Sequence, residues 1–224
     1  MKRDIPSWVL VGLLVASGAA RAQEGVPSGR GQGWSVLSGQ SVGQQGNALV
    51  GQVGWPGLSL GLLHGATPQL DIGGKLSFNY GHEGIVTSVL PGLKLQGWVR
   101  LMLLESSKVN LGLSFAPGPF FYFYERSTEV GLALPLSFTL GIPVGSAVML
   151  NVGLDIPFYV IFGSGGGPVF PLLVGGGMEY FIDRNLAVTF NVRMGPSIGV
   201  YGDLLGRRQA RFALEALLGV SYRL

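Results

Sequence analysis

The fold is decided by the stretch from Glu129 to Phe162, which reads EVGLALPLSFTLGIPVGSAVMLNVGLDIPFYVIF. Large apolar residues occupy every second position from Val130 to Leu140 and again from Val148 to Val160, with the short turn Gly141–Gly145 between the runs. Successive side chains of a β-strand point to opposite faces, so this period of two is typical of strands. The stretch therefore predicts two β-strands joined by a short turn.

The composition favours a membrane protein that crosses the bilayer with strands. Only 12% of the 224 residues are charged, 47% are hydrophobic, and the mean hydropathy is +0.43. A water-soluble domain of this composition is short of polar surface, yet no run of about 18 uninterrupted apolar residues is present to form a transmembrane helix. We expect a membrane β-barrel.

The first 22 residues have the organisation of a secretory signal peptide. Lys2 and Arg3 form a positive start, Trp8–Ala16 is a short apolar core, and Ala20–Ala22 is an A-x-A cleavage site. The short apolar core disfavours the alternative of a retained membrane anchor. We expect residues 1–22 to be removed, residues 23–32 to form a flexible periplasmic leader, and residues 33–224 to form the barrel.

Charge and cysteine content exclude several classes of function. Without residues 1–22 the chain keeps 12 basic and 11 acidic residues, so its basicity gives no argument for a nucleic-acid partner. The absence of cysteine excludes disulfides, thiol catalysis and thiolate metal sites. No His or carboxylate pair has the spacing of a metal site, and we expect no cofactor.

Alternation and turn residues predict about ten antiparallel strands in an up-and-down barrel, with eight as the alternative. The segment 47–64 breaks phase at Trp55-Pro56-Gly57, which we interpret as a bulge or kink, or else as the junction of two short strands. The first segment alternates poorly. The expected strands are 34–42, 47–64, 69–80, 92–105, 108–124, 129–140, 147–162, 169–182, 185–199 and 209–223.

Tight and longer connections largely alternate along the chain. Gly65–Pro68, Ser106–Ser107, Gly141–Ser146 and Asp183–Arg184 are tight, whereas 81–91 and 200–208 are longer. Outer-membrane barrels have short periplasmic turns and longer outside loops. We therefore expect the tight turns and both chain ends on the periplasmic side.

With this alternation, these turns and the signal peptide, the chain resembles small bacterial outer-membrane β-barrel proteins of Gram-negative cells. The last strand fits that class, since Phe212, Leu214, Ala216, Leu218, Val220 and Tyr222 alternate to the end, although the final residue is Leu224 rather than an aromatic residue. The resemblance implies residence in the outer membrane, contact with its lipids, and recognition of the C-terminal strand by the barrel assembly machinery.

The small face of the expected strands carries Gly, Ala, Ser and Pro, which suits the crowded interior of a narrow barrel. The charges expected on this inner face are Asp71, Lys75, Lys94, Arg100, Glu129, Asp155, Glu179, Arg193, Arg211 and Glu215. They either pair into a polar plug that stabilises the barrel or line a narrow aqueous path. A large open channel is disfavoured because ten strands enclose little space.

Six prolines fall in the outer half of the expected strands, where each removes a ladder donor: Pro91, Pro117, Pro119, Pro157, Pro171 and Pro196. One hypothesis is a loosened wall that gives lipids or apolar solutes a sideways route. The alternative places these residues above the hydrocarbon, where strand pairing matters less.

His82, followed by Glu83 and near Ser88, forms the only candidate rim site. Lipid-modifying outer-membrane enzymes use a Ser, a His and an acidic group, but the spacing here is no motif, and a solvated loop is the simpler interpretation. The leading expectation is a non-enzymatic, porin-like barrel that is structural or passes small or apolar solutes through a narrow lumen. The alternatives are a lipid-modifying enzyme and a secreted soluble barrel that holds an apolar ligand.

Overall fold

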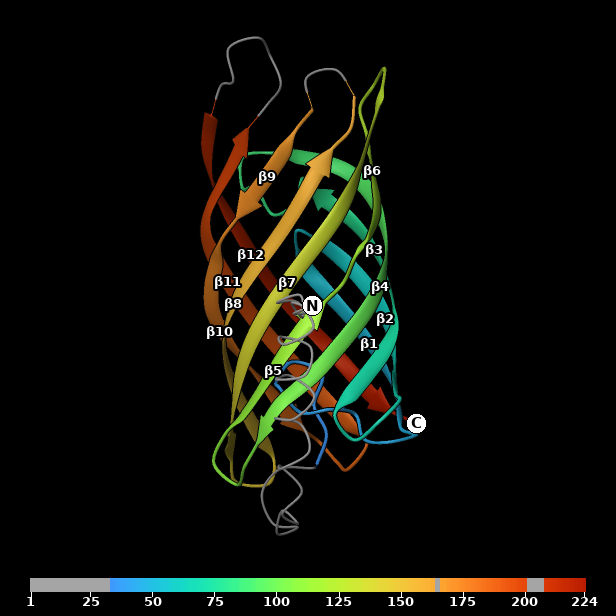
Figure 1. Ribbon diagram of the computed structural model, residues 1–224, viewed down its shortest axis with the longest axis vertical. Coiled ribbons are helices and arrows are strands. Elements are labelled where there is room, and N and C mark those ends of the chain that lie inside the picture. The colour runs from blue at the N-terminus through green and yellow to red at the C-terminus, as the bar shows by residue number, and fades with distance from the viewer. Residues whose placement is uncertain (1–32, 164–165, 201–207) are drawn as a thin grey trace, which may run out of the picture.

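The computed structural model describes residues 33–163, 166–200 and 208–224, and all of their regular structure is β (Figure 1). The signal peptide expected at 1–22 and the leader expected at 23–32 lie outside these residues. The strands are β1 Asn47–Trp55, β2 Gly57–Gly65, β3 Leu70–Gly81, β4 Val89–Glu105, β5 Asn110–Phe115, β6 Gly118–Phe123, β7 Thr128–Val144, β8 Val148–Ile161, β9 Pro168–Pro171, β10 Leu173–Phe181, β11 Leu186–Val200 and β12 Arg208–Arg223.

These segments form a closed antiparallel barrel of ten strands, which confirms the predicted fold class. The barrel closes where β12 pairs with β1, from Ala48 opposite Arg223 to Trp55 opposite Ala216. Two barrel strands are each interrupted once: β5 and β6 both pair with β4 and β7, and β9 and β10 both lie between β8 and β11. The first interruption consists of Ala116 and Pro117; the second is Leu172, directly after Pro171.

The alternation predicted from the sequence sorts side chains between the outside and the lumen. On β7, Phe138 and Leu140 are more than a third exposed on the outer face, while Ala133 is buried inside. Small inner residues are needed because large neighbours cross the lumen. A Cβ atom on Gly131 would lie 2.1 Å from the Phe120 ring, so only glycine fits there.

The strand predicted at 34–42 is wrong, because this segment lies inside the turn end of the barrel without forming a strand (Figure 1). Serine side chains bind its own backbone: Ser38 N donates to Ser35 Oγ at 2.8 Å and Gly43 N donates to Ser41 Oγ at 2.8 Å. Such local bonds compete with strand pairing. Trp34 and Val42 are fully buried, so we call residues 34–42 the lumen segment.

The interpretation of 47–64 as one kinked strand is also wrong, and the alternative of two short strands is confirmed. β1 and β2 pair from Asn47 opposite His64 to Val53 opposite Leu58, and the chain reverses through Pro56 between them. The strand predicted at 34–42 is lost, and the division of 47–64 into β1 and β2 adds one, so the number of barrel strands remains ten.

Because β1 ends at Trp55, opposite Ala216, the part of β12 before Ala216 has no neighbouring strand on that side among the described residues, and the loop 82–88 takes its place. Ile85 forms an isolated antiparallel bridge with Ala213. Leu214 N donates to Gly84 O at 2.9 Å, and Val86 N donates to Phe212 O at 3.3 Å. The wall here depends on two backbone hydrogen bonds rather than on a full ladder.

The lumen is filled in layers. At the turn end, where β2 turns into β3, an apolar cluster surrounds the lumen segment and includes Trp34, Val36, Val42, Leu63 and Met149. Toward the loop end, where β6 turns into β7, a second cluster contains Leu90, Phe120, Tyr122, Ala133, Tyr159, Ile161 and Val169. Between the two layers the inward residues are mostly polar.

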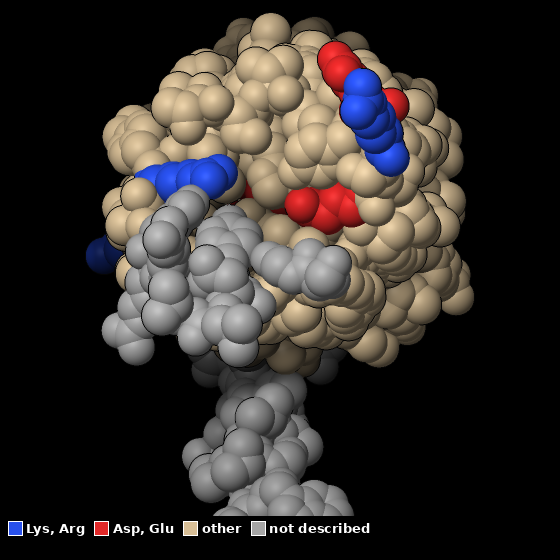
Figure 2. All heavy atoms as spheres, turned by 90° about the horizontal axis from the view of Figure 1, so that it is seen from above, with Lys and Arg blue, Asp and Glu red and all other residues tan. Residues whose placement is uncertain are grey.

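Figure 2 shows the loop end, where few Lys, Arg, Asp and Glu atoms reach the visible surface. Within the described ranges, no helix is long and apolar enough to cross a membrane.

Candidate functional site

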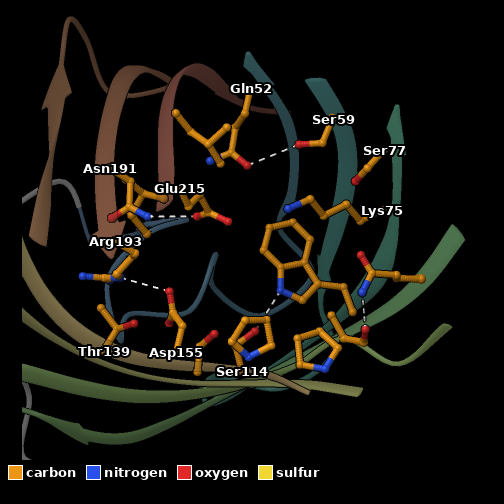
Figure 3. A pocket seen from close by; sticks show the side chains of 18 of the residues that line it. Gln52, Ser59, Lys75, Ser77, Ser114, Thr139, Asp155, Asn191, Arg193 and Glu215 are labelled. Carbon is orange, nitrogen blue, oxygen red and sulfur yellow. Dashed lines mark hydrogen bonds and ion pairs between the residues drawn. The ribbon is translucent and has the colours of Figure 1, made fainter. Parts of the chain in front are cut away.

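The polar layer between the two clusters encloses a cavity of about 230 Å³, which we call the central cavity (Figure 3). It is formed by inward residues of strands around the whole barrel. Its polar lining includes Gln52, Ser59, Lys75, Ser77, Gln96, Ser114, Ser137, Thr139, Asp155, Asn191, Arg193 and Glu215. A polar, hydroxyl-rich chamber of this size suits one small solute or several water molecules.

Two charged residues face the central cavity without an opposite charge within 4.0 Å among the described residues. The Lys75 ammonium lies 5.9 Å from the centroid of the Trp98 ring. The Glu215 carboxylate accepts a long hydrogen bond of 3.4 Å from Asn191 Nδ2. Figure 3 shows the two side chains pointing toward one another across the cavity from β3 and β12.

A second pair of charges, Arg193 and Asp155, lines another side of the cavity. Arg193 Nε on β11 donates to Asp155 Oδ2 on β8 at 3.0 Å, and Arg193 Nη2 donates to Asn151 Oδ1 at 3.3 Å. Arg193 Nη1 is buried and has no hydrogen-bond partner within the described part of the chain. Arg193 therefore neutralises Asp155, and its Nη1 donor remains unpaired among the described residues.

At the turn end, Arg100 holds the lumen segment in place. Its guanidinium donates to the carbonyls of Ser35, Ser38 and Gln40 at 2.9, 2.9 and 2.8 Å. It also lies 3.4 Å from Asp71 on the neighbouring strand. One buried cation thus provides hydrogen bonds to three carbonyls of a segment that forms no strand pairing.

Two carboxylates bind the same segment from other strands. Asp71 accepts from Val42 N at 3.1 Å, and Glu179 on β10 accepts from Val36 N at 2.9 Å and from the Ser35 hydroxyl. Both carboxylates are fully buried. The lumen segment is therefore fixed by charge-assisted hydrogen bonds at both of its ends.

At the loop end, Glu83 forms the centre of a second network. Lys94 Nζ donates to Glu83 at 2.6 Å, and the Tyr122 hydroxyl donates to it at 2.7 Å. Burial raises the pKa of Glu83, but the Lys94 charge and the hydrogen bonds of Lys94 and Tyr122 outweigh burial, and the net pKa is below its ordinary value. The network fastens the loop 82–88 to β4 and β6.

His82 is buried, which contradicts the interpretation of this region as a solvated loop. Its Nε2 atom lies 2.9 Å from Glu129 Oε1, and its ring packs edge-on against Tyr122. Ser88 meets His82 through backbone atoms, since His82 N donates to Ser88 O at 2.9 Å. The Ser–His–acid arrangement of the enzyme alternative is absent from the described hydrogen bonds of His82; the acid that contacts it is Glu129.

The charges predicted for the lumen thus separate by layer. Asp71, Arg100 and Glu179 bind the lumen segment, Lys75, Asp155, Arg193 and Glu215 surround the central cavity, and Lys94 and Glu129 join the loop-end network. Arg211 differs, because it is exposed near the loop end of β12, opposite Ser197.

Sequence reasoning missed the neutral members of these networks. Asn110 accepts from Gly39 N at 2.8 Å, and Asn79 donates to the Tyr122 hydroxyl at 2.8 Å. Asparagine on an inward position of an otherwise Gly- and Ala-rich face is the signal that could have found both residues.

Within the described ranges, no group of three His, Cys, Asp or Glu residues is arranged to hold a metal ion. The chain matches none of the protein-family models and none of the curated proteins with which it was compared.

Proposed function

We propose that the protein is a non-enzymatic integral β-barrel of the bacterial outer membrane. The outward face carries the argument. Side chains such as Leu60, Leu95 and Leu218 are 64%, 61% and 54% exposed on three different strands. Soluble monomers rarely expose apolar surface on this scale, whereas a bilayer covers it favourably.

The distribution of charge supports the same proposal. The described Lys, Arg, Asp and Glu residues whose burial is defined either face the lumen or lie near the ends of strands and in the connections. Exposed aromatic side chains such as Phe78, Tyr80, Phe123, Tyr180 and Tyr222 lie close to the two ends of the barrel. Aromatic residues at those levels match the interfacial girdles of outer-membrane barrels.

The filled lumen favours a closed, structural barrel over an open pore. Trp34 at the turn end and Phe120 and Tyr159 toward the loop end are fully buried inside the barrel. The central cavity is the one observation that favours passage of small solutes as a second candidate. Single-channel recording of the refolded full chain in planar bilayers decides between them, since a folded but silent barrel supports closure and discrete openings support a path.

Membrane insertion itself is tested with spin labels, because the chain has no cysteine. The variants Leu60→Cys and Ser59→Cys place a label on neighbouring residues that face outward and inward. In lipid vesicles the label at residue 60 should be accessible to oxygen and shielded from a water-soluble nickel complex, while the label at residue 59 is shielded from lipid-dissolved oxygen. Accessibility of residue 60 to nickel, with full solubility in detergent-free buffer, would instead support the soluble barrel that holds an apolar ligand.

The enzyme alternative is tested at His82. Its contact with Glu129 and its aromatic surroundings are explained by packing, so we expect His82→Gln to leave the lipid composition of an expressing cell unchanged. A lipid modification that appears on expression of the natural chain and disappears with His82→Gln would overturn the non-enzymatic proposal.

A further inference from the structure

The central cavity contains charges and polar groups that the protein itself leaves unmatched. Lys75 on β3 and Glu215 on β12 are separated by β1 and β2 in the barrel wall, and they are not within 4.0 Å of an opposite charge among the described residues. They point toward one another across the cavity (Figure 3). Each therefore presents a charge to whatever fills the space between them.

A second observation comes from β11, the strand next to β12 in the wall. Arg193 and Asn191 are 3% and 7% exposed, and both line the cavity. Arg193 Nη1 and Asn191 Oδ1 are buried without a partner in the described residues. A buried donor and a buried acceptor left unpaired are costly, which points to a bound polar molecule that satisfies them.

The sign of the charges selects the kind of molecule. Arg193 and Asp155 neutralise each other at 3.0 Å. The other charged residues that line the cavity are also paired, Lys94 with Glu83 at 2.6 Å and Arg100 with Asp71 at 3.4 Å. This leaves Lys75 and Glu215 as one positive and one negative group. A simple anion in the cavity matches Lys75 but faces Glu215 unfavourably, and a simple cation has the reverse problem. A molecule with both charges matches both residues.

We propose that the central cavity is a binding site for a small zwitterionic amino carboxylate, with its carboxylate toward Lys75 and its ammonium toward Glu215. Ser59, Ser77 and Gln52 provide further hydrogen-bonding groups, and the Trp98 ring faces the apolar spacer of the ligand. The volume of about 230 Å³ restricts the site to one small molecule. The proposal goes beyond the role of the barrel in the membrane and does not depend on insertion, because the barrel itself forms the cavity.

The test is calorimetric titration of the refolded full chain in detergent micelles with glycine, β-alanine, 4-aminobutyrate and 5-aminopentanoate. This series lengthens the spacing between the two charges one carbon at a time. We expect saturable one-to-one binding with an optimum in the series, and binding at least about tenfold weaker for butyrate and butylamine, which carry only one charge each. Binding by none of the zwitterions, or equally tight binding of butyrate or butylamine, would overturn the proposal even without any variant.

Variants then assign the contacts. Lys75→Met and Glu215→Gln should each weaken binding of the best zwitterion at least about tenfold, whereas the exposed Lys108→Met and Glu125→Gln should not change it. The exchange Lys75→Glu with Glu215→Lys keeps both charges and reverses their positions, so it should restore binding. Binding unchanged by the single variants, or absent in a folded charge-exchanged variant, would contradict the assignment.

Discussion

Arg100 and Asp71 stand directly opposite each other on neighbouring strands, and together they hold one piece of chain that belongs to neither strand. Arg100 binds the carbonyls of Ser35, Ser38 and Gln40, while Asp71, 3.4 Å away, accepts from the amide of Val42. Each charge is balanced by the other as well as by the segment, so the lumen segment is bound by an ion pair.

Replacing Arg100 by Met should destabilise the folded barrel by about 3–5 kcal/mol, because it leaves Asp71 buried without its counter-ion and three carbonyls without a donor. The free energy of unfolding in urea, followed by tryptophan fluorescence in detergent, measures the loss. Arg100→Lys keeps the charge but lacks the several donors of the guanidinium group, so its free energy of unfolding should lie between those of the natural protein and Arg100→Met. Arg126→Met, in the exposed loop after β6, is the control and should change stability by less than about 0.5 kcal/mol. Equal stability of Arg100→Met and the control would show that Arg100 does not stabilise the lumen segment.

The lumen segment passes so close to the wall at Gly39 that a methyl group should displace it. A Cβ atom on Gly39 would lie 2.4 Å from the backbone nitrogen of Gly112. We expect Gly39→Ala to cost about 1–3 kcal/mol of unfolding free energy. Gly74→Ala is the matched control, since its nearest neighbour would be 3.7 Å away, and it should not destabilise the protein. Increased protease sensitivity of residues 33–46 in Gly39→Ala alone would locate the effect in this segment.

The loop 82–88 can be fastened to β12 by a disulfide. Ile85 and Ala213 form a non-hydrogen-bonded antiparallel pair, flanked by the bonds from Leu214 N and Val86 N, and this kind of pair brings the Cα atoms to about 4.5 Å. The variant Ile85→Cys with Ala213→Cys should therefore oxidise spontaneously and gain about 2–4 kcal/mol of stability, which is lost on reduction. Free thiols that persist under oxidising conditions would contradict the observed bridge.

The same disulfide should slow association of the zwitterion, because the loop borders the cavity at Gly84.

The Glu83 network gives the stability a defined dependence on pH. The folded-state pKa of Glu83 is below the ordinary value of 4.5, so its contribution is complete above about pH 4.5 and is lost as the pH falls through the lower folded-state pKa. We expect Glu83→Gln to cost about 1–3 kcal/mol at neutral pH and progressively less in acid. Urea unfolding of both proteins between pH 7 and pH 3 measures the difference. A difference that stays constant over this range would show that packing, not charge, is responsible; Glu125→Gln serves as the exposed control.

The sequence was most informative where one physical pattern governs a long segment. Alternation from Val130 to Val160 predicted β7 and β8, but β7 continues to Val144 through most of the turn expected at 141–146. The two strands pair without interruption from Gly131 to Val144. It failed where local bonds replace the ladder. Ser35, Ser38 and Ser41 bind nearby backbone groups, and a weak alternation in 34–42 could not reveal that the segment turns inward.

The candidate site also has features that the sequence predicts and features that it does not. Position along a strand assigns Asp71 and Arg193 to one side of the wall, but their partners depend on which strands meet. Asp71 faces Arg100 because β3 and β4 are neighbours, which chain order alone predicts. The bonds from Ser35 and Val36 to Glu179 join positions more than 140 residues apart and depend on the path of the lumen segment. His82 was misjudged because a residue in a loop between two strands was expected to face solvent.

The lumen segment leads directly into β1, the strand whose pairing with β12 closes the barrel. The lumen segment, which fills the interior, and β1, which closes the wall, are therefore contiguous in the chain. The hydrogen bonds of Arg100, Asp71 and Glu179 hold the lumen segment next to this closing strand. We therefore expect closure of the barrel and filling of its interior to be coupled during folding.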